Sequence, residues 1–185
     1  MFYIGLDLGQ RQDHTAIAIL ERQTNRLLVR RAERLPLGTP YPAVVERVKA
    51  IVTALSQSVL IVDGTGVGIP VVELLRRAGL PCEVIAVTIS GGDRESGSGA
   101  SWSVPKRDLI AGIQVALEKH ELKIAKRMKE VATLIRELTD VRIKATRIGA
   151  EGAGQHDDLV IALALACWRA RRRENTYGRQ RLPGI

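Results

Sequence analysis

The chain has 185 residues, of which 28 are Lys or Arg and 20 are Asp or Glu, so its formal net charge is +8. This length suits one domain with its own hydrophobic core, and it excludes most two-domain ATPases and sugar kinases. The apolar fraction of 45% and the charged fraction of 26% are typical of a soluble globular protein. Cys82 and Cys167 are too few for a disulfide framework or a zinc site, and we expect buried thiols in a reducing compartment.

No segment of the sequence predicts a membrane span or a signal peptide. The longest apolar run, Leu159 to Trp168, has ten residues, about half of what a membrane span needs. Asp7 interrupts the apolar start of the chain, and no small-residue cleavage site follows it. We therefore expect a cytoplasmic protein without a membrane partner.

The positive charge is concentrated in two segments. Residues 105–147 carry a net charge of +5 and residues 169–185 another +5, whereas residues 148–168 between them carry −3. A polyanion such as nucleic acid is the natural partner of such a surface. Solvated helix faces and an Arg-rich tail produce the same distribution, so charge alone does not decide the function.

The hydrophobic pattern predicts a mixed sheet flanked by helices. In chain order we expect strands at 2–8, 15–20 and 27–32, a helix at 43–55, a strand at 59–62, a helix at 70–78, a strand at 82–89, a helix at 105–118, a strand at 122–125, a helix at 126–138, an edge strand at 141–148 and a buried helix at 158–173. Residues 90–103, rich in Gly and Ser, are predicted to be a mobile loop.

This order of elements predicts an α/β fold of the ribonuclease H-like type. An antiparallel meander comes first, parallel strands joined by crossover helices follow, and helices cover both faces of the sheet. We expect one domain over residues 1–173 and a basic, flexible tail over residues 174–185.

Carboxylates occur at three separate places along this fold. Asp7 lies inside the first strand, Asp63 ends the central strand before a glycine loop, and Asp157 and Asp158 begin the last helix. A turn explains Asp63 and a helix cap explains Asp158. Asp7 needs a partner, because a carboxylate within an apolar strand is costly to bury. In a mixed sheet the first and fourth strands can be neighbours, which would bring these acids together under the last helix.

Such a cluster predicts a divalent-metal site. Two carboxylates about 4 Å apart repel by about 4 kcal/mol at an effective dielectric constant of about 20, so a cluster of them needs cations. Ligands that are all oxygen favour Mg²⁺ or Mn²⁺. Two such ions about 3.5–4 Å apart catalyse in-line displacement at phosphorus.

Four blocks of sequence resemble, in the right order, the C-terminal nuclease domain of bacteriophage large terminases. The blocks are FYIGLDLGQRQDHTAIAIL at 2–20, IVDGTGVGIPVVELL at 61–75, VPKRDLI at 104–110 and QHDDLVIALALA at 155–166. The resemblance implies a ribonuclease H-like, RuvC-like fold and a two-metal endonuclease that cleaves concatemeric viral DNA during genome packaging.

The resemblance also implies roles for individual residues. Asp7, Asp63 and Asp158 are the expected catalytic metal ligands, and Asp157 shares or replaces the role of Asp158. His156 is a possible auxiliary residue. Asp13 also matches an acid of the family, but the sequence context favours a turn residue. Contacts to double-stranded DNA are predicted for Lys106, Arg107, Lys123, Lys126, Arg127 and Lys129, without preference for base sequence.

The chain departs from the family because it contains no Walker A pattern. It is therefore expected to be either an excised nuclease domain or a free-standing homologue. As part of a terminase it would work with an ATPase motor domain, the small terminase and the portal in the cytoplasm of a bacterial host. The alternative functions are a RuvC-like Holliday junction resolvase, an actin-like ATPase, for which the chain is too short, and a non-catalytic DNA-binding module.

Overall fold

The computed structural model describes residues 1–9, 13–66, 68–146 and 157–172. Its strands are β1 (Phe2–Asp7), β2 (Ala16–Gln23), β3 (Arg26–Arg34), β4 (Ser58–Asp63), β5 (Glu83–Ser90), β6 (Ser96–Ser98), β7 (Ser101–Pro105) and β8 (Leu122–Ile124). Its helices are α1 (Tyr41–Thr53), α2 (Gly68–Arg77), α3 (Lys106–Glu118), α4 (Val131–Thr146) and α5 (Asp158–Arg171). The predicted mixed α/β order is confirmed.

All eight strands form one sheet in the order β6-β7-β5-β4-β1-β2-β3-β8. The pairs β1–β2, β2–β3 and β6–β7 are antiparallel. The pairs β1–β4, β4–β5, β5–β7 and β3–β8 are parallel. The meander and the crossover strands therefore meet at β1 and β4, in the middle of the sheet.

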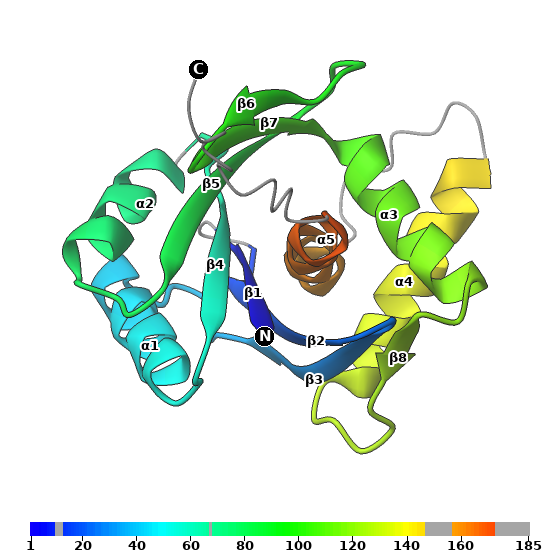
Figure 1. Cartoon of the computed structure of the whole chain (residues 1–185), viewed down its shortest axis with the longest axis horizontal. Coiled ribbons are helices and arrows are strands. Elements are labelled where there is room, and N and C mark those ends of the chain that lie inside the picture. The colour runs from blue at the N-terminus through cyan, green and yellow to red at the C-terminus, as the bar shows by residue number, and fades with distance from the viewer. Residues whose placement is uncertain (10–12, 67, 147–156, 173–185) are drawn as a thin grey trace, which may run out of the picture.

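Helices cover the two faces of the sheet, and each face has its own hydrophobic cluster. Helices α1 and α2 lie on one side, and α3, α4 and α5 lie on the other (Figure 1). Ile4 and Leu6 of β1 belong to the cluster on the α1–α2 side. Tyr3 belongs to the cluster that contains α5. The period of two along the strand thus also directs Gly5 and Asp7 toward α5.

Helix α5 packs closely across the middle of the sheet. Its buried residues occur on all sides of the helix, as its apolar sequence predicts. The contact with β1 depends on Gly5, because a Cβ atom there would lie 1.8 Å from the carbonyl oxygen of Ala162. The missing side chain of Gly5 therefore allows the backbones of β1 and α5 to approach each other.

Two sequence predictions are wrong in the second half of the chain. Residues 141–146 belong to α4 and form no edge strand, and 147–148 lie outside the described residues. The alternation of apolar and polar residues in this segment suggested a strand. However, Val131, Leu134, Leu138 and Val141 recur at steps of three and four, and all pack against the core beside α5. Helix α4 also begins five residues later than the predicted 126–138 helix.

The segment 90–103 contains the short hairpin of β6 and β7, so it is not the simple loop that its composition predicted. Trp102 anchors this hairpin on α5. Its ring packs edge to face on Trp168, with centroids 5.8 Å apart, and the Arg172 guanidinium lies 4.1 Å from its centroid. The high glycine and serine content therefore did not reveal that this segment forms a hairpin packed on α5.

Candidate metal-dependent nuclease site

Asp7 and Asp63 lie side by side at the ends of two adjacent parallel strands. Leu6 of β1 pairs with Val62 of β4, and Asp7 and Asp63 are the next residues on the two strands. Val59 and Ile61 of β4 belong to the cluster beside α5, so the period of two places Asp63 on that same face. Neighbouring strands are about 4.8 Å apart, and the two carboxylates therefore start from adjacent positions under α5.

The N-terminus of α5 brings the second pair of acids to the same place. Asp157 is the N-cap residue of this helix and Asp158 is its first residue. Asp158 is 6% exposed. Because α5 packs on β1 and β4, its first turn lies over the carboxyl ends of both strands.

One cavity of about 420 Å³ collects these side chains. Its lining consists of Asp7, Leu8, Gly9, Asp13, Asp63, Thr65, Ile89, Lys106, Asp157, Asp158 and Ile161. The structure thus brings together all four acids that the sequence singled out. It adds Asp13, for which we had favoured a turn role. Residues 10–12 and His156 lie outside the described residues.

The carboxylates in this cavity repel one another in the absence of a cation. Burial raises the pKa of Asp7 well above its usual value, and the carboxylates of Asp63, Asp158 and Asp157 raise it further. The Lys106 ammonium acts in the opposite direction. Asp7 therefore occupies a position at which its negative charge is unfavourable unless additional positive charge is bound.

Three of the acids have polar partners of their own in this structure. The Lys106 Nζ atom lies 2.8 Å from Asp157 Oδ2, and Asp63 Oδ1 accepts the backbone N–H of Thr65 at 2.8 Å. Asp158 Oδ2 lies 3.5 Å from the Arg34 guanidinium. Within the described ranges, no three acidic, His or Cys side chains are close enough together to hold a metal ion.

The donor set nevertheless fits hard divalent cations. Carboxylate oxygens are the ligands that Mg²⁺ and Mn²⁺ prefer, and the cavity supplies them from two strands and one helix. A bound cation would relieve the repulsion that raises the pKa of Asp7.

Of the predicted DNA contacts, only Lys106 lines the cavity. Arg107 follows it at the start of α3 and pairs with Asp93 at 2.7 Å. Lys123 lies on β8 at the far edge of the sheet, next to β3. Lys126, Arg127 and Lys129 are exposed in the connection between β8 and α4.

Sequence reasoning missed Glu137, which is buried in α4 and only 3% exposed. Its carboxylate forms an ion pair with Arg34 and accepts hydrogen bonds from the first turn of α5. A signal was present, because position 137 lies three residues after Leu134 and therefore on the buried face of the helix. Burial raises the pKa of Glu137 to about 7, although the Arg34 charge lowers it.

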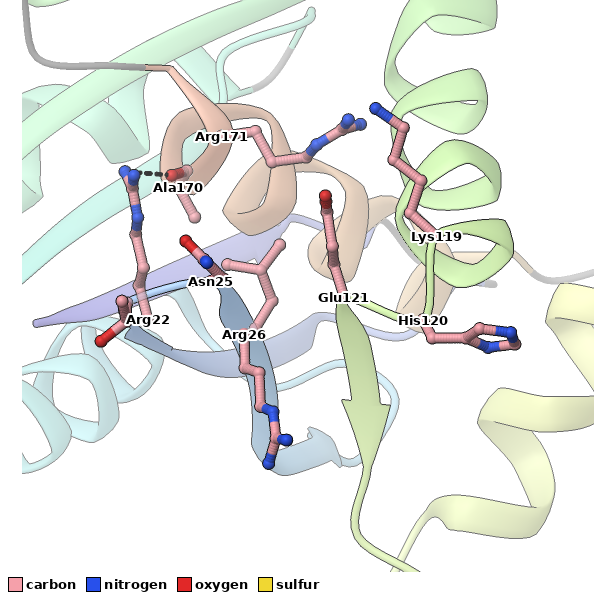
Figure 2. Close-up of a pocket in the computed structure, with 10 residues that line it drawn as sticks. Arg22, Asn25, Arg26, Lys119, His120, Glu121, Ala170 and Arg171 are labelled. Carbon is pink, nitrogen blue, oxygen red and sulfur yellow. Dashed lines mark hydrogen bonds between the residues drawn. The ribbon is translucent and has the colours of Figure 1, made fainter.

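A second, larger cavity of about 650 Å³ lies beside the last turn of α5 (Figure 2). Its lining consists of Arg22, Thr24, Asn25, Arg26, Leu27, Lys119, His120, Glu121, Ala170 and Arg171. Figure 2 shows Arg22 donating to the carbonyl oxygen of Ala170, at 2.7 Å. With one carboxylate among several cations, this cavity does not suit a metal ion.

No helix in the described part of the chain is both long and apolar enough to cross a membrane.

Known proteins resemble this chain in sequence and fold, although no protein-family model matches it. The large terminase subunit of Thermus virus P23-45 is 27% identical over 171 residues, which are 90% of this chain and 31% of that protein. The chain thus spans about a third of the length of this curated relative.

Solved structures show the same fold. The large terminase nuclease from thermophilic phage G20c with bound magnesium has a TM-score of 0.63 and 24% identity, over 91% of this chain and 81% of that one. The human cytomegalovirus terminase nuclease domain, soaked with manganese, has a TM-score of 0.57 and 13% identity, over 90% and 81%. The predicted ribonuclease H-like fold of the terminase nucleases is confirmed.

Proposed function

We propose that this chain is a metal-dependent DNA endonuclease, and that it cleaves concatemeric viral DNA during genome packaging. The observation that carries the proposal is the single cavity in which Asp7, Asp63, Asp157 and Asp158 meet. The resemblance to terminase nucleases in sequence and fold supports it. The magnesium and manganese in two of those structures support a divalent cation here.

In this proposal Asp7, Asp63 and Asp158 hold two Mg²⁺ or Mn²⁺ ions, and Asp157 shares the role of Asp158. When bound, such ions lower the pKa of an attacking water and stabilise the charge on the leaving 3′ oxygen. The carboxylates fix the positions of the ions from two strands and a helix. Lys106 lines the cavity beside Asp157, and its ammonium has further donors that can contact a phosphate oxygen of the DNA.

The longer relative suggests the wider setting. Because the chain corresponds to about a third of that large terminase subunit, we propose that it acts with an ATPase motor domain. The small terminase and the portal would be further partners, in the cytoplasm of the bacterial host.

Plasmid nicking tests the proposed activity. Wild-type protein should nick supercoiled plasmid with Mn²⁺ or Mg²⁺ and not with EDTA. Asp63→Asn and Asp158→Asn should each lower the rate by more than about 100-fold, because even the loss of an outer partner of a metal ligand costs about 10–100-fold. Glu46→Gln, an exposed acid on α1 on the other side of the sheet, is the matched control and should nick at the wild-type rate.

Full activity in a folded Asp63→Asn or Asp158→Asn protein would remove that residue from the site. A wild-type protein that leaves plasmid intact with either metal would support the non-catalytic DNA-binding module instead. Strong preference for four-way junctions over linear duplex would support the resolvase.

DNA binding without cleavage tests the proposed contacts. In EDTA, affinity for duplex DNA should fall steeply with salt, because each neutralised phosphate releases counterions. Lys106→Gln should weaken binding and make the slope of log K against log salt shallower by about one unit. Lys49→Gln on α1 is the control, because Lys49 is equally a surface lysine but lies on the opposite face. Fluorescence anisotropy measures both quantities, and identical slopes for all three proteins would exclude Lys106 as a phosphate contact.

A further inference from the structure

A buried ion pair links three elements next to the proposed metal site. Arg34, the last residue of β3, forms an ion pair with Glu137 of α4. The same guanidinium nitrogen lies 3.5 Å from Asp158 Oδ2. The side chains of Arg34, Glu137 and Asp158 are only 17%, 4% and 8% exposed. The Arg34 guanidinium thus faces two carboxylates. One belongs to Asp158, a proposed metal ligand, and the other belongs to Glu137, which does not line the cavity.

Glu137 also completes the start of α5. Its Oε2 atom accepts the backbone N–H groups of Leu159 at 3.1 Å and Val160 at 3.3 Å. First-turn N–H groups have no partner inside their own helix, and a side chain at the N-cap usually accepts them. Here the N-cap residue Asp157 makes no such bond, and its carboxylate is paired with Lys106 instead. A residue of α4 therefore does the capping, and Asp157 lines the cavity without being used as a helix cap.

The stability of the fold does not by itself explain a buried ion pair at this place. A buried ion pair loses much of its attraction to desolvation, and apolar residues of similar size are often at least as stabilising. Its geometry instead serves the position of Asp158. The two N–H groups that Glu137 accepts belong to the residues that follow Asp158, and the Arg34 guanidinium lies 3.5 Å from the carboxylate of Asp158 itself.

We propose that Glu137 and Arg34 are positioning residues for Asp158. Neither one lines the cavity, so both act through the first turn of α5 rather than on DNA or on the metal. The inference rests on the proposed function, since orienting Asp158 matters to catalysis only if Asp158 binds an ion. It adds two residues, from β3 and α4, to a site otherwise formed by β1, β4 and α5.

Mn²⁺ titration calorimetry without DNA, run well below the melting temperature of every variant, tests the inference. Glu137→Ala should weaken Mn²⁺ binding about 10-fold or more, in the range seen for outer partners of metal ligands. Glu137→Gln keeps an oxygen that accepts the two N–H groups and should recover most of the affinity. Arg34→Lys should weaken binding because the lysine ammonium ends one bond short of the guanidinium nitrogen that faces both carboxylates. Arg136→Ala, an exposed neighbour on α4, should bind like wild type.

Plasmid nicking at increasing Mn²⁺ gives the second readout. Glu137→Ala and Arg34→Lys should need more Mn²⁺ for half-maximal rate. A lower melting temperature with wild-type Mn²⁺ affinity in both variants would overturn the inference and leave a structural ion pair. Equal losses in Glu137→Ala and Glu137→Gln would overturn the capping role. Because wild type is measured in parallel, failure of wild type itself to bind Mn²⁺ and nick DNA would instead reject the proposed nuclease.

Discussion

Asparagine in place of Asp7 is expected to abolish metal-dependent DNA cleavage and to raise the melting temperature of the metal-free protein. Cleavage should fall by more than about 100-fold because Asp7 is a proposed metal ligand that shares the cavity with Asp63, Asp157 and Asp158. Stability should rise because the neutral amide removes the repulsion that raises the pKa of Asp7. A gain of about 1 kcal/mol corresponds to roughly 2–4 °C for a chain of this size.

The effect on stability should depend on pH. In metal-free wild type the pKa of Asp7 is higher in the folded than in the unfolded state, so its contribution to stability is lost as the pH rises above the usual carboxylate range. Glu137, whose folded pKa is about 7, adds a loss between its usual value of 4.5 and about 7. The melting temperature of wild type should therefore fall between about pH 5 and about pH 8, and Asp7→Asn should fall less.

Thermal unfolding in EDTA and in Mg²⁺ distinguishes this account from a simple loss of folding. Mg²⁺ should stabilise wild type and should not stabilise Asp7→Asn, because binding to the folded state alone raises stability. Glu46→Gln should match wild type under every condition. An Asp7→Asn protein that melts below wild type in EDTA at about pH 8 would contradict the electrostatic account of the cavity.

Alanine in place of Gly5 is expected to destabilise the protein more than any surface change. The new methyl group would lie 1.8 Å from the carbonyl oxygen and 2.8 Å from the carbonyl carbon of Ala162, both of which are backbone atoms of α5. Overpacking of a core costs about 1–3 kcal/mol and occasionally more, and backbone cannot rotate away as a side chain can. We expect the free energy of unfolding to fall by about 3 kcal/mol, which corresponds to a melting temperature lower by roughly 6–12 °C.

Gly91→Ala is the matched control for Gly5→Ala. No atom lies within 4 Å of a Cβ atom built on Gly91, so its melting temperature should stay close to that of wild type. Gly5→Ala should also cleave DNA more slowly at temperatures at which it is folded, because a displaced α5 moves Asp158 away from Asp7. A wild-type melting temperature for Gly5→Ala would show that β1 and α5 are not in close contact.

The centre of the fold and the acidic cluster could be predicted because their signals are local. An apolar strand with one carboxylate, a second strand ending in Asp63 and an apolar helix beginning at Asp158 are each readable without the tertiary structure. The period of two along β1 and β4 then decides which face the acids share. The resemblance to terminase nucleases supplied the remaining step from three separate acids to one site.

The features that were missed depend on contacts between distant segments. The 90–103 segment reads as a loop because its partner, Trp168, comes far later in the chain. Residues 141–146 read as a strand because their alternation stands out locally, whereas Val141 continues the helical step of Val131, Leu134 and Leu138, which packs against the core beside α5. Glu137 reads as one more surface charge, and only the meeting of β3, α4 and α5 identifies its role.

The most direct test of the account is anomalous diffraction from a crystal of this protein soaked in Mn²⁺. The account predicts two peaks about 3.5–4 Å apart in the cavity, held by carboxylate oxygens of Asp7, Asp63 and the Asp157–Asp158 pair. A cavity without a peak at Mn²⁺ concentrations that support cleavage would contradict it, as would Mn²⁺ bound only at residues outside the cavity.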